Sequence, residues 1–219
     1  MPGPARVVLV GGGLAAAKTA QSLRKRGYEG ELTLLAAESH RPYERPGLSK
    51  GYLNGSSPRD ALFVHDADWY RQQGVDLHTG TDVVALDRER REVRTAGGDR
   101  FRYDSVLLAT GAVPRRLRVP GGDSDGVQYL RTLDDSDALR ARFATGGRVV
   151  IVGGGWIGLE TAAAARAAGC RKAGSSIPCP GRLAHMSPRQ ASAISASLAP
   201  ARSRARRSVS PPANRQLRT

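Results

Sequence analysis

The chain has 219 residues, a mass of 23.3 kDa and 40% hydrophobic residues, enough for one large domain or two small ones. No run of about 18 apolar residues could span a bilayer, and no positively charged leader precedes the strand-like VVLV, so we expect a cytoplasmic protein without a membrane segment. Cys170 and Cys179 are too few for a disulfide framework, and they form no zinc-ligand spacing with the four histidines. We therefore expect no metal site.

The net charge of +14 is concentrated at the C-terminal end of the chain. Residues 1–170 carry 24 basic and 20 acidic side chains, whereas residues 171–219 carry ten basic and no acidic ones. These last residues contain no Phe, Tyr or Trp and are rich in Ser, Ala, Arg and Pro, which predicts a disordered tail. The segment RSRARRS, residues 202–208, offers an electrostatic contact to nucleic acid or to an acidic membrane, but a solvated tail explains the same charges without a partner.

The first predicted elements are a short buried strand, RVVLV at residues 6–10, and a helix that begins in a glycine-rich turn. Gly11, Gly13 and Ala16 fit the pattern GxGxxG/A. In this pattern the first glycine makes a tight turn, the second lets a pyrophosphate approach the backbone, and the small third residue lets the helix pack on the strand. The free N–H groups of the helix N-terminus then face the phosphates.

A second parallel strand is predicted at ELTLLA, residues 31–36, and Glu38 lies just beyond its end. A carboxylate at that place can accept hydrogen bonds from ribose hydroxyls. The order of strand, glycines, helix, strand and acid favours a dinucleotide-binding unit over a glycine-rich turn in an ordinary α/β unit.

Between this dinucleotide-binding unit and residue 111, the sequence predicts several short strands. GVDLHTG at 74–80 reads as one strand, and residues 83–87, 92–95 and 101–104 read as three strands separated by turn-forming residues. SVLLATG, residues 105–111, predicts a buried strand that ends in a Thr-Gly turn.

The glycine motif then occurs a second time. Residues 149–169 align with residues 7–27 without gaps and with 10 of 21 positions identical, so that Gly153, Gly155 and Gly158 take the glycine positions. Two such motifs in one chain predict two dinucleotides and electron transfer between them.

This arrangement resembles the pyridine nucleotide oxidoreductases that contain two dinucleotide-binding domains. RPYERPGLSKGYL, residues 41–53, is similar to the PYxRPPLSK segment of the ferredoxin reductases, and also to that of rubredoxin reductases and apoptosis-inducing-factor-like proteins. The resemblance extends over about residues 5–170. Gly47 replaces the second proline of that segment, and Ala37 stands where the family often has another acid.

The resemblance implies FAD and NAD(P)H as cofactors. Glu38 would hold the adenosine ribose, Arg45 would contact the FAD phosphate or adenosine region, and Lys50 would lie near the flavin ring as a catalytic residue. Arg45 and Lys50 could instead be solvated loop charges, and Thr110 a structural turn residue. The other implied FAD contacts are Gly11, Gly13, Ala16, Val83, Thr110, Gly111 and Arg115.

The second unit would receive NAD(P)H at Gly153, Gly155 and Gly158, and Glu160 would lie near the nicotinamide, where hydride passes to the flavin, unless it is only a helix-surface charge. Residues 1–169 contain no cysteine, so the redox cysteine pair of the disulfide reductases is missing and electrons must leave the flavin directly. The implied partner is a ferredoxin-like iron–sulfur protein.

The predicted fold is α/β. A Rossmann-like FAD-binding unit with an antiparallel β-meander (1–117) precedes the first βα piece of a second Rossmann-like NAD(P) unit (118–170) and a disordered basic tail (171–219). We expect the second unit to stop at its helix, because CRKAGSSIPCP has no β-branched run. Thirty Arg against four Lys are typical of a GC-rich gene, so we hypothesise that the tail is a frameshift product. The alternative functions are a non-catalytic remnant with weak or no FAD binding and a nucleic-acid-binding protein that uses its basic tail.

Overall fold

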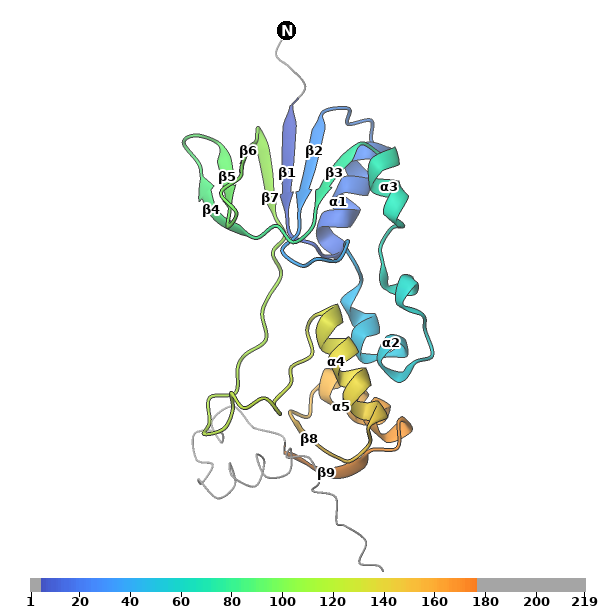
Figure 1. Ribbon diagram of the computed structural model, residues 1–219. Coiled ribbons are helices and arrows are strands. Elements are labelled where there is room, and N and C mark those ends of the chain that lie inside the picture. The colour runs from blue at the N-terminus through green and yellow to red at the C-terminus, as the bar shows by residue number, and fades with distance from the viewer. Residues whose placement is uncertain (1–4, 177–219) are drawn as a thin grey trace, which may run out of the picture.

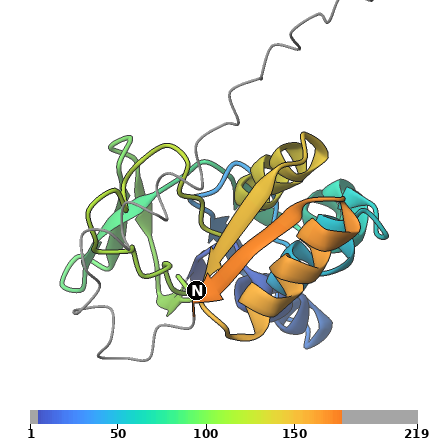
Figure 2. The same ribbon diagram turned by 90° about the horizontal axis from the view of Figure 1, so that it is seen from below.

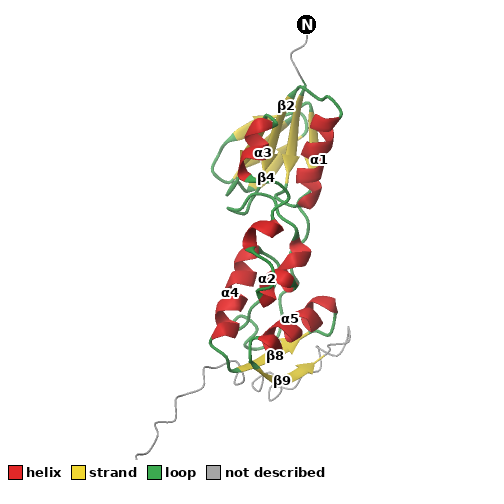
Figure 3. Ribbon diagram, turned by 90° about the vertical axis from the view of Figure 1, so that its right-hand side faces the viewer, coloured by secondary structure: helices red, strands yellow, loops and turns green. Residues whose placement is uncertain are grey.

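The computed structural model describes residues 5–176, which form two α/β units one above the other (Figures 1 and 3). The upper unit is built on a parallel sheet with the strand order β3-β2-β1-β7. Its strands are β1 (Arg6–Val10), β2 (Glu31–Leu35), β3 (Val75–His78) and β7 (Ser105–Leu108). The parallel order with β1 in the interior brings the carboxyl ends of β1, β2 and β7 to one edge, where the first glycine turn lies.

The two faces of this sheet are covered by different layers. Helices α1 (Leu14–Lys25) and α3 (Ala67–Gln72) cover one face, and the antiparallel meander of β4 (Val83–Asp87), β5 (Glu92–Thr95) and β6 (Arg100–Arg102) lies against the other (Figure 1). Alternation along β1 explains the layers, because Leu9 packs with the helices while Val8 and Val10 pack with the meander. The predicted fold class is confirmed for this unit.

A segment that follows β2 leaves the upper unit and packs on the lower one. It contains the 3₁₀ turns η1 (Arg45–Ser49) and η2 (Arg59–Leu62) and the short helix α2 (Gly51–Asn54). Leu48 and Tyr52 share an apolar cluster with Leu133, and Leu53 packs against Ala164 of the lower unit. The segment that resembles the ferredoxin reductases therefore lies between the two glycine turns.

The lower unit consists of α4 (Leu133–Ala144), β8 (Arg148–Val152), α5 (Trp156–Ala167) and β9 (Arg171–Ser176). A capping box between Thr132 and Asp135 begins α4. Strands β8 and β9 form a parallel pair beside α5 (Figure 2). This unit thus contains the predicted βα piece.

Strand β9 extends the lower unit one element beyond the expected end of the unit at residue 170. RKAGSS has low strand propensity, and its pairing with β8 contains a register shift between Val149 and Ile151. The backbone of β8 therefore provides the hydrogen bonds that this sequence pattern does not predict. Residues 177–219, which hold most of the predicted tail, lie outside the described residues.

Among residues 5–176, no helix is both long and apolar enough to cross a membrane. The same residues contain no group of three or more His, Cys, Asp or Glu side chains arranged to hold a metal ion.

Candidate functional site

The first glycine turn has the shape that a pyrophosphate requires. Gly11 has a φ of +131°, and a Cβ there would overlap the carbonyl oxygen of Ala109, so only glycine fits. Gly13 precedes the first residue of α1 with an extended backbone, and a Cβ there would meet no atom within 4 Å. Ala16 is fully buried. A tight turn, an open approach to the helix N-terminus and a close helix–strand contact therefore follow one another in the predicted order.

The second glycine turn repeats this geometry. Gly153 has a φ of +119°, and Gly155 precedes α5 with open space at its Cβ position. A Cβ on Gly158 would overlap the carbonyl oxygen of Gly153, so the helix can approach the strand only with glycine at this position. Both turns thus present free N–H groups of a helix to open space.

Glu38 and Arg45, to which the resemblance assigns separate FAD contacts, form one ion pair. The Arg45 Nη2 atom lies 2.7 Å from Glu38 Oε1, and both side chains are about one quarter exposed (28% and 25%). Tyr43 donates a hydrogen bond to the other Glu38 oxygen and accepts one from the Leu133 amide at 3.0 Å. Burial, followed by the Glu38 hydrogen bond, raises the pKa of the Tyr43 hydroxyl, which therefore stays protonated as the donor.

Arg131 completes this group, and the sequence motifs do not point to it. Its carbonyl accepts a hydrogen bond of 2.6 Å from Arg45. Its Nε atom is buried and has no hydrogen-bond partner among the described residues, and its Nη2 atom lies 3.2 Å from the Cβ position of Gly111. An unpartnered buried guanidinium donor beside the turn after β7 suits an anionic group. The only sequence signal is its position directly before the capping box at Thr132.

The two predicted catalytic residues are brought together from the two units. The Lys50 Nζ atom lies 3.8 Å from Glu160 Oε1. Ser49, which is 7% exposed, donates a 2.5 Å hydrogen bond to Glu160 Oε2. Glu160 is therefore not a solvated helix-surface charge, because both of its oxygens face the segment that carries Lys50.

Four other predicted FAD contacts lie in three different places. Val83 begins β4 and is half-buried, and Thr110 and Gly111 form the exposed turn after β7, in which Gly111 has a φ of +73°. Arg115 is exposed on the connection between β7 and α4, and no hydrogen bond or ion pair links it to the other site residues within the described part of the chain. The geometry thus supports the turn at Thr110 and Gly111 more directly than it supports Arg115.

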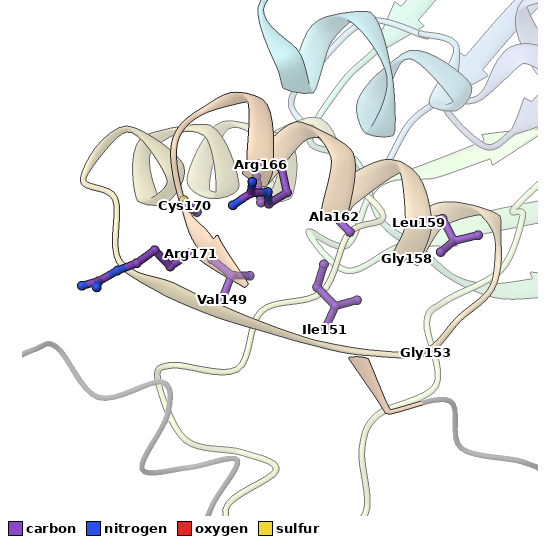
Figure 4. Close-up of a pocket in the computed structure, with 10 residues that line it drawn as sticks. Val149, Ile151, Gly153, Gly158, Leu159, Ala162, Arg166, Cys170 and Arg171 are labelled. Carbon is purple, nitrogen blue, oxygen red and sulfur yellow. The ribbon is translucent and has the colours of Figure 1, made fainter. Parts of the chain in front are cut away.

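An apolar hollow of about 50 Å³ lies between α5 and β8 (Figure 4). Ala162 and Gly158 of α5 lie across it from Val149 and Ile151 of β8. Near the N-terminus of α5, Trp156 is 84% exposed. The hollow is bounded by the glycine turn at one end, but its lining offers a nucleotide few polar partners. It is best described as an uncovered face of the β8–α5 layer.

Comparison with known proteins gives consistent matches. Residues 5–215 match the family model described as pyridine nucleotide-disulphide oxidoreductase. The ferredoxin–NAD(+) reductase component of the anthranilate 1,2-dioxygenase system of Burkholderia cepacia is 44% identical over 166 residues, which cover 74% of this chain and 40% of the relative.

Two solved structures agree with that match. A putidaredoxin reductase in covalent complex with putidaredoxin has a TM-score of 0.73 at 37% identity over 78% of this chain and 42% of its own. A ferredoxin reductase from Rhodopseudomonas palustris has a TM-score of 0.74 at 38% identity over 85% of this chain and 46% of its own. The chain thus spans less than half the length of these relatives.

Proposed function

Because the chain belongs to the pyridine nucleotide-disulphide oxidoreductase family, we propose that it binds FAD at the first glycine turn and NAD(P)H at the second. The proposed activity is electron transfer from NAD(P)H through the flavin to a ferredoxin-like iron–sulfur protein. The name of the Burkholderia relative and the complex of putidaredoxin reductase with putidaredoxin support this acceptor class.

The observation that carries the proposal is the open space at Gly13. At this position nothing lies within 4 Å of where a Cβ would be, although the adjoining strand and helix are fully packed at Leu9 and Ala16. A pyrophosphate can therefore reach the amides of the first turn of α1 without any movement of the backbone.

The charged groups around the turn fit the rest of FAD. Glu38 keeps free lone pairs for ribose hydroxyls although Arg45 and Tyr43 already contact it. The buried Nε–H of Arg131 has no partner among the described residues, and the Nη2 atom of the same guanidinium lies beside Gly111 at the turn after β7. When FAD is bound, it accepts a hydride as two electrons and releases them singly. Lys50 would place a positive charge where the reduced flavin accumulates negative charge.

A second candidate function is cofactor binding without turnover. It is favoured by the exposed apolar side chains in the first turn of α5, where Trp156, Ile157 and Leu159 are 84%, 55% and 58% exposed. A site that leaves such groups in water excludes water poorly from a reacting nicotinamide.

Matched substitutions at the two glycine turns test the cofactor assignment. Gly13→Val should leave the fold intact, because the position is extended and open, and should weaken FAD binding at least tenfold by blocking the pyrophosphate. Gly155→Val is the control in the lower unit. It should leave FAD affinity unchanged and weaken NAD(P)H binding.

Flavin fluorescence during titration gives the FAD affinity, and circular dichroism gives the fold. Equal FAD affinity in the wild-type chain and in a folded Gly13→Val variant would contradict the assignment. Anaerobic addition of NADH or NADPH to the FAD-loaded chain then separates the two candidate functions, since only the electron-transfer function bleaches the flavin.

A further inference from the structure

Ser49 is a buried polar residue at the contact between the segment that follows β2 and the lower unit. It is the last residue of η1, is 7% exposed, and donates to Glu160 Oε2 at 2.5 Å. The other oxygen of the same carboxylate faces Lys50 Nζ at 3.8 Å. The Glu160 carboxylate of α5 thus contacts two consecutive residues, Ser49 and Lys50, of the segment that follows β2.

The serine contact is the stronger of the two. The Lys50 side chain is 59% exposed, so its ion pair with Glu160 adds little to stability, although the carboxylate still attracts the ammonium to one side. The hydrogen bond from the buried Ser49 hydroxyl to the Glu160 carboxylate is directional and shielded from water, so it restricts the carboxylate more than the ion pair does. The orientation of Glu160 is therefore set by Ser49, and Lys50 follows the carboxylate.

Ser49 is itself held from the opposite side. The fully buried Ser136 of α4 donates a 2.9 Å hydrogen bond to the carbonyl oxygen of Leu48. Leu48 is 2% exposed, and Leu53 packs on Ala164 of α5. These contacts fix the backbone of η1 against α4. The side chain of Ser49, which follows Leu48, then points toward α5.

We propose that Ser49 is a positioning residue, which holds Glu160 so that the carboxylate of the lower unit places the Lys50 ammonium. In the function proposed above, on which the catalytic meaning of this inference rests, Ser49 links the helix that follows the NAD(P)H turn to the lysine beside the flavin. The hydrogen bond itself requires no cofactor and can be tested in the free chain.

The test uses the full chain without cofactor and observes the Lys50 side chain. The chain has four lysines, Lys18, Lys25, Lys50 and Lys172, so the side-chain NMR signals of selectively labelled lysine can be assigned with Lys50→Arg. Ser49→Ala should give the Lys50 signal the averaged shift and mobility of an unpaired lysine. Ser49→Thr, which keeps the hydroxyl, should restore the wild-type signal, and Ser56→Ala is the exposed control.

A double-mutant cycle measures the coupling. The double variant Ser49→Ala/Glu160→Gln should lose less unfolding free energy than the two single variants lose in sum. The difference should correspond to about tenfold in the unfolding equilibrium constant. Glu160→Gln, which removes the charge that Lys50 faces, should release Lys50 as Ser49→Ala does. If Ser49→Ala does not fold, Ser49→Cys, which is close to serine in size but a weak donor, gives the same test of the hydroxyl. A wild-type Lys50 signal in a folded Ser49→Ala or Glu160→Gln variant would overturn the proposal.

A separate experiment tests the effect of Ser49 on function. In the FAD-loaded chain, Ser49→Ala should slow flavin reduction by NAD(P)H more than it weakens nicotinamide binding, and Ser49→Thr should restore the rate. If the chain does not bind FAD, the proposed function fails while the NMR result still decides whether Ser49 positions Lys50.

Discussion

The two glycine turns are nearly the same in sequence and backbone, yet the units around them differ in how well they are covered. Gly11 and Gly153 both adopt a positive φ, and both helices start in open space. In the upper unit, β1 lies between two strands and under two layers, and Leu9 is fully buried. In the lower unit, every residue of β8 after the first is only half-buried.

This difference indicates that the shape of a dinucleotide turn is local, whereas its stability comes from its neighbours. The turn geometry is set by glycines within a few residues, so it forms in both units. The burial of the strand depends on strands and helices from distant sequence, which the upper unit has and the described part of the lower unit largely lacks.

The largest expected difference in stability is between alanine substitutions at Gly11 and Gly153, the first glycines of the two turns. Gly11→Ala forces a Cβ into the Ala109 carbonyl and a strained φ, and should cost about 3 kcal/mol or more of upper-unit stability. Gly153→Ala meets no atom within 4 Å and should cost only the φ strain, about 1–2 kcal/mol. Urea unfolding followed by circular dichroism measures both costs, and equal costs would show that the close contact at Gly11 adds no strain.

Alkaline pH should destabilise the upper unit through the ionisation of Tyr70. Burial raises the pKa of this residue, which is 2% exposed, to about 12, so folding favours the protonated hydroxyl. Its stabilising contribution is complete below the unfolded pKa near 10 and is lost as pH rises through 12, by about 3 kcal/mol.

Tyr70→Phe should remove that part of the alkaline loss. The substitution should cost little at neutral pH, because the Tyr70 hydroxyl has no hydrogen-bond partner among the described residues. Thermal unfolding at pH 8 and pH 11 compares the two proteins. An identical alkaline loss in both would show that other groups cause it.

Tyr43→Phe should give an intermediate effect, because Tyr43 links the two units. Its hydroxyl contacts Glu38 above and the Leu133 amide below, so removal leaves that amide unpaired and should cost about 1–3 kcal/mol. Hydrogen exchange should show the loss of protection at the first turn of α4 before it appears in β1. Unchanged exchange at Leu133 would argue against the link.

The smallest effect on stability is expected at Trp156 on the open side of the lower unit. Trp156→Ser should change the unfolding free energy by less than about 0.5 kcal/mol, because the side chain is 84% exposed. It should reduce self-association, which analytical ultracentrifugation measures, since less apolar surface meets water. A large stability loss would mean that Trp156 is covered in solution.

Much of the fold follows from local patterns. The repeat of the glycine motif predicts both βα turns, and short strand-like runs separated by turn-forming residues predict the strands of the meander. Strand β9 was not predictable, because RKAGSS has no strand pattern and is held by the edge of β8. The packing of α2 on α4 and α5 was not predictable either, since the contact of Leu53 with Ala164 joins residues far apart in sequence.

The site follows the same rule. The glycines, Glu38 and Lys50 are marked by spacing and by resemblance, so the sequence identifies them as candidates. The pairing of Lys50 with Glu160 and the orphaned Nε of Arg131 arise only when separate segments meet. Sequence patterns therefore name candidate side chains, and tertiary contacts decide which of them act together.

The most direct test of the claim that the upper unit is a competent FAD cradle is the absorbance spectrum of the purified chain after incubation with FAD and removal of free cofactor. We expect an equimolar flavin band that remains with the wild-type chain and is lost with Gly13→Val. A colourless wild-type chain that is folded by circular dichroism would contradict it.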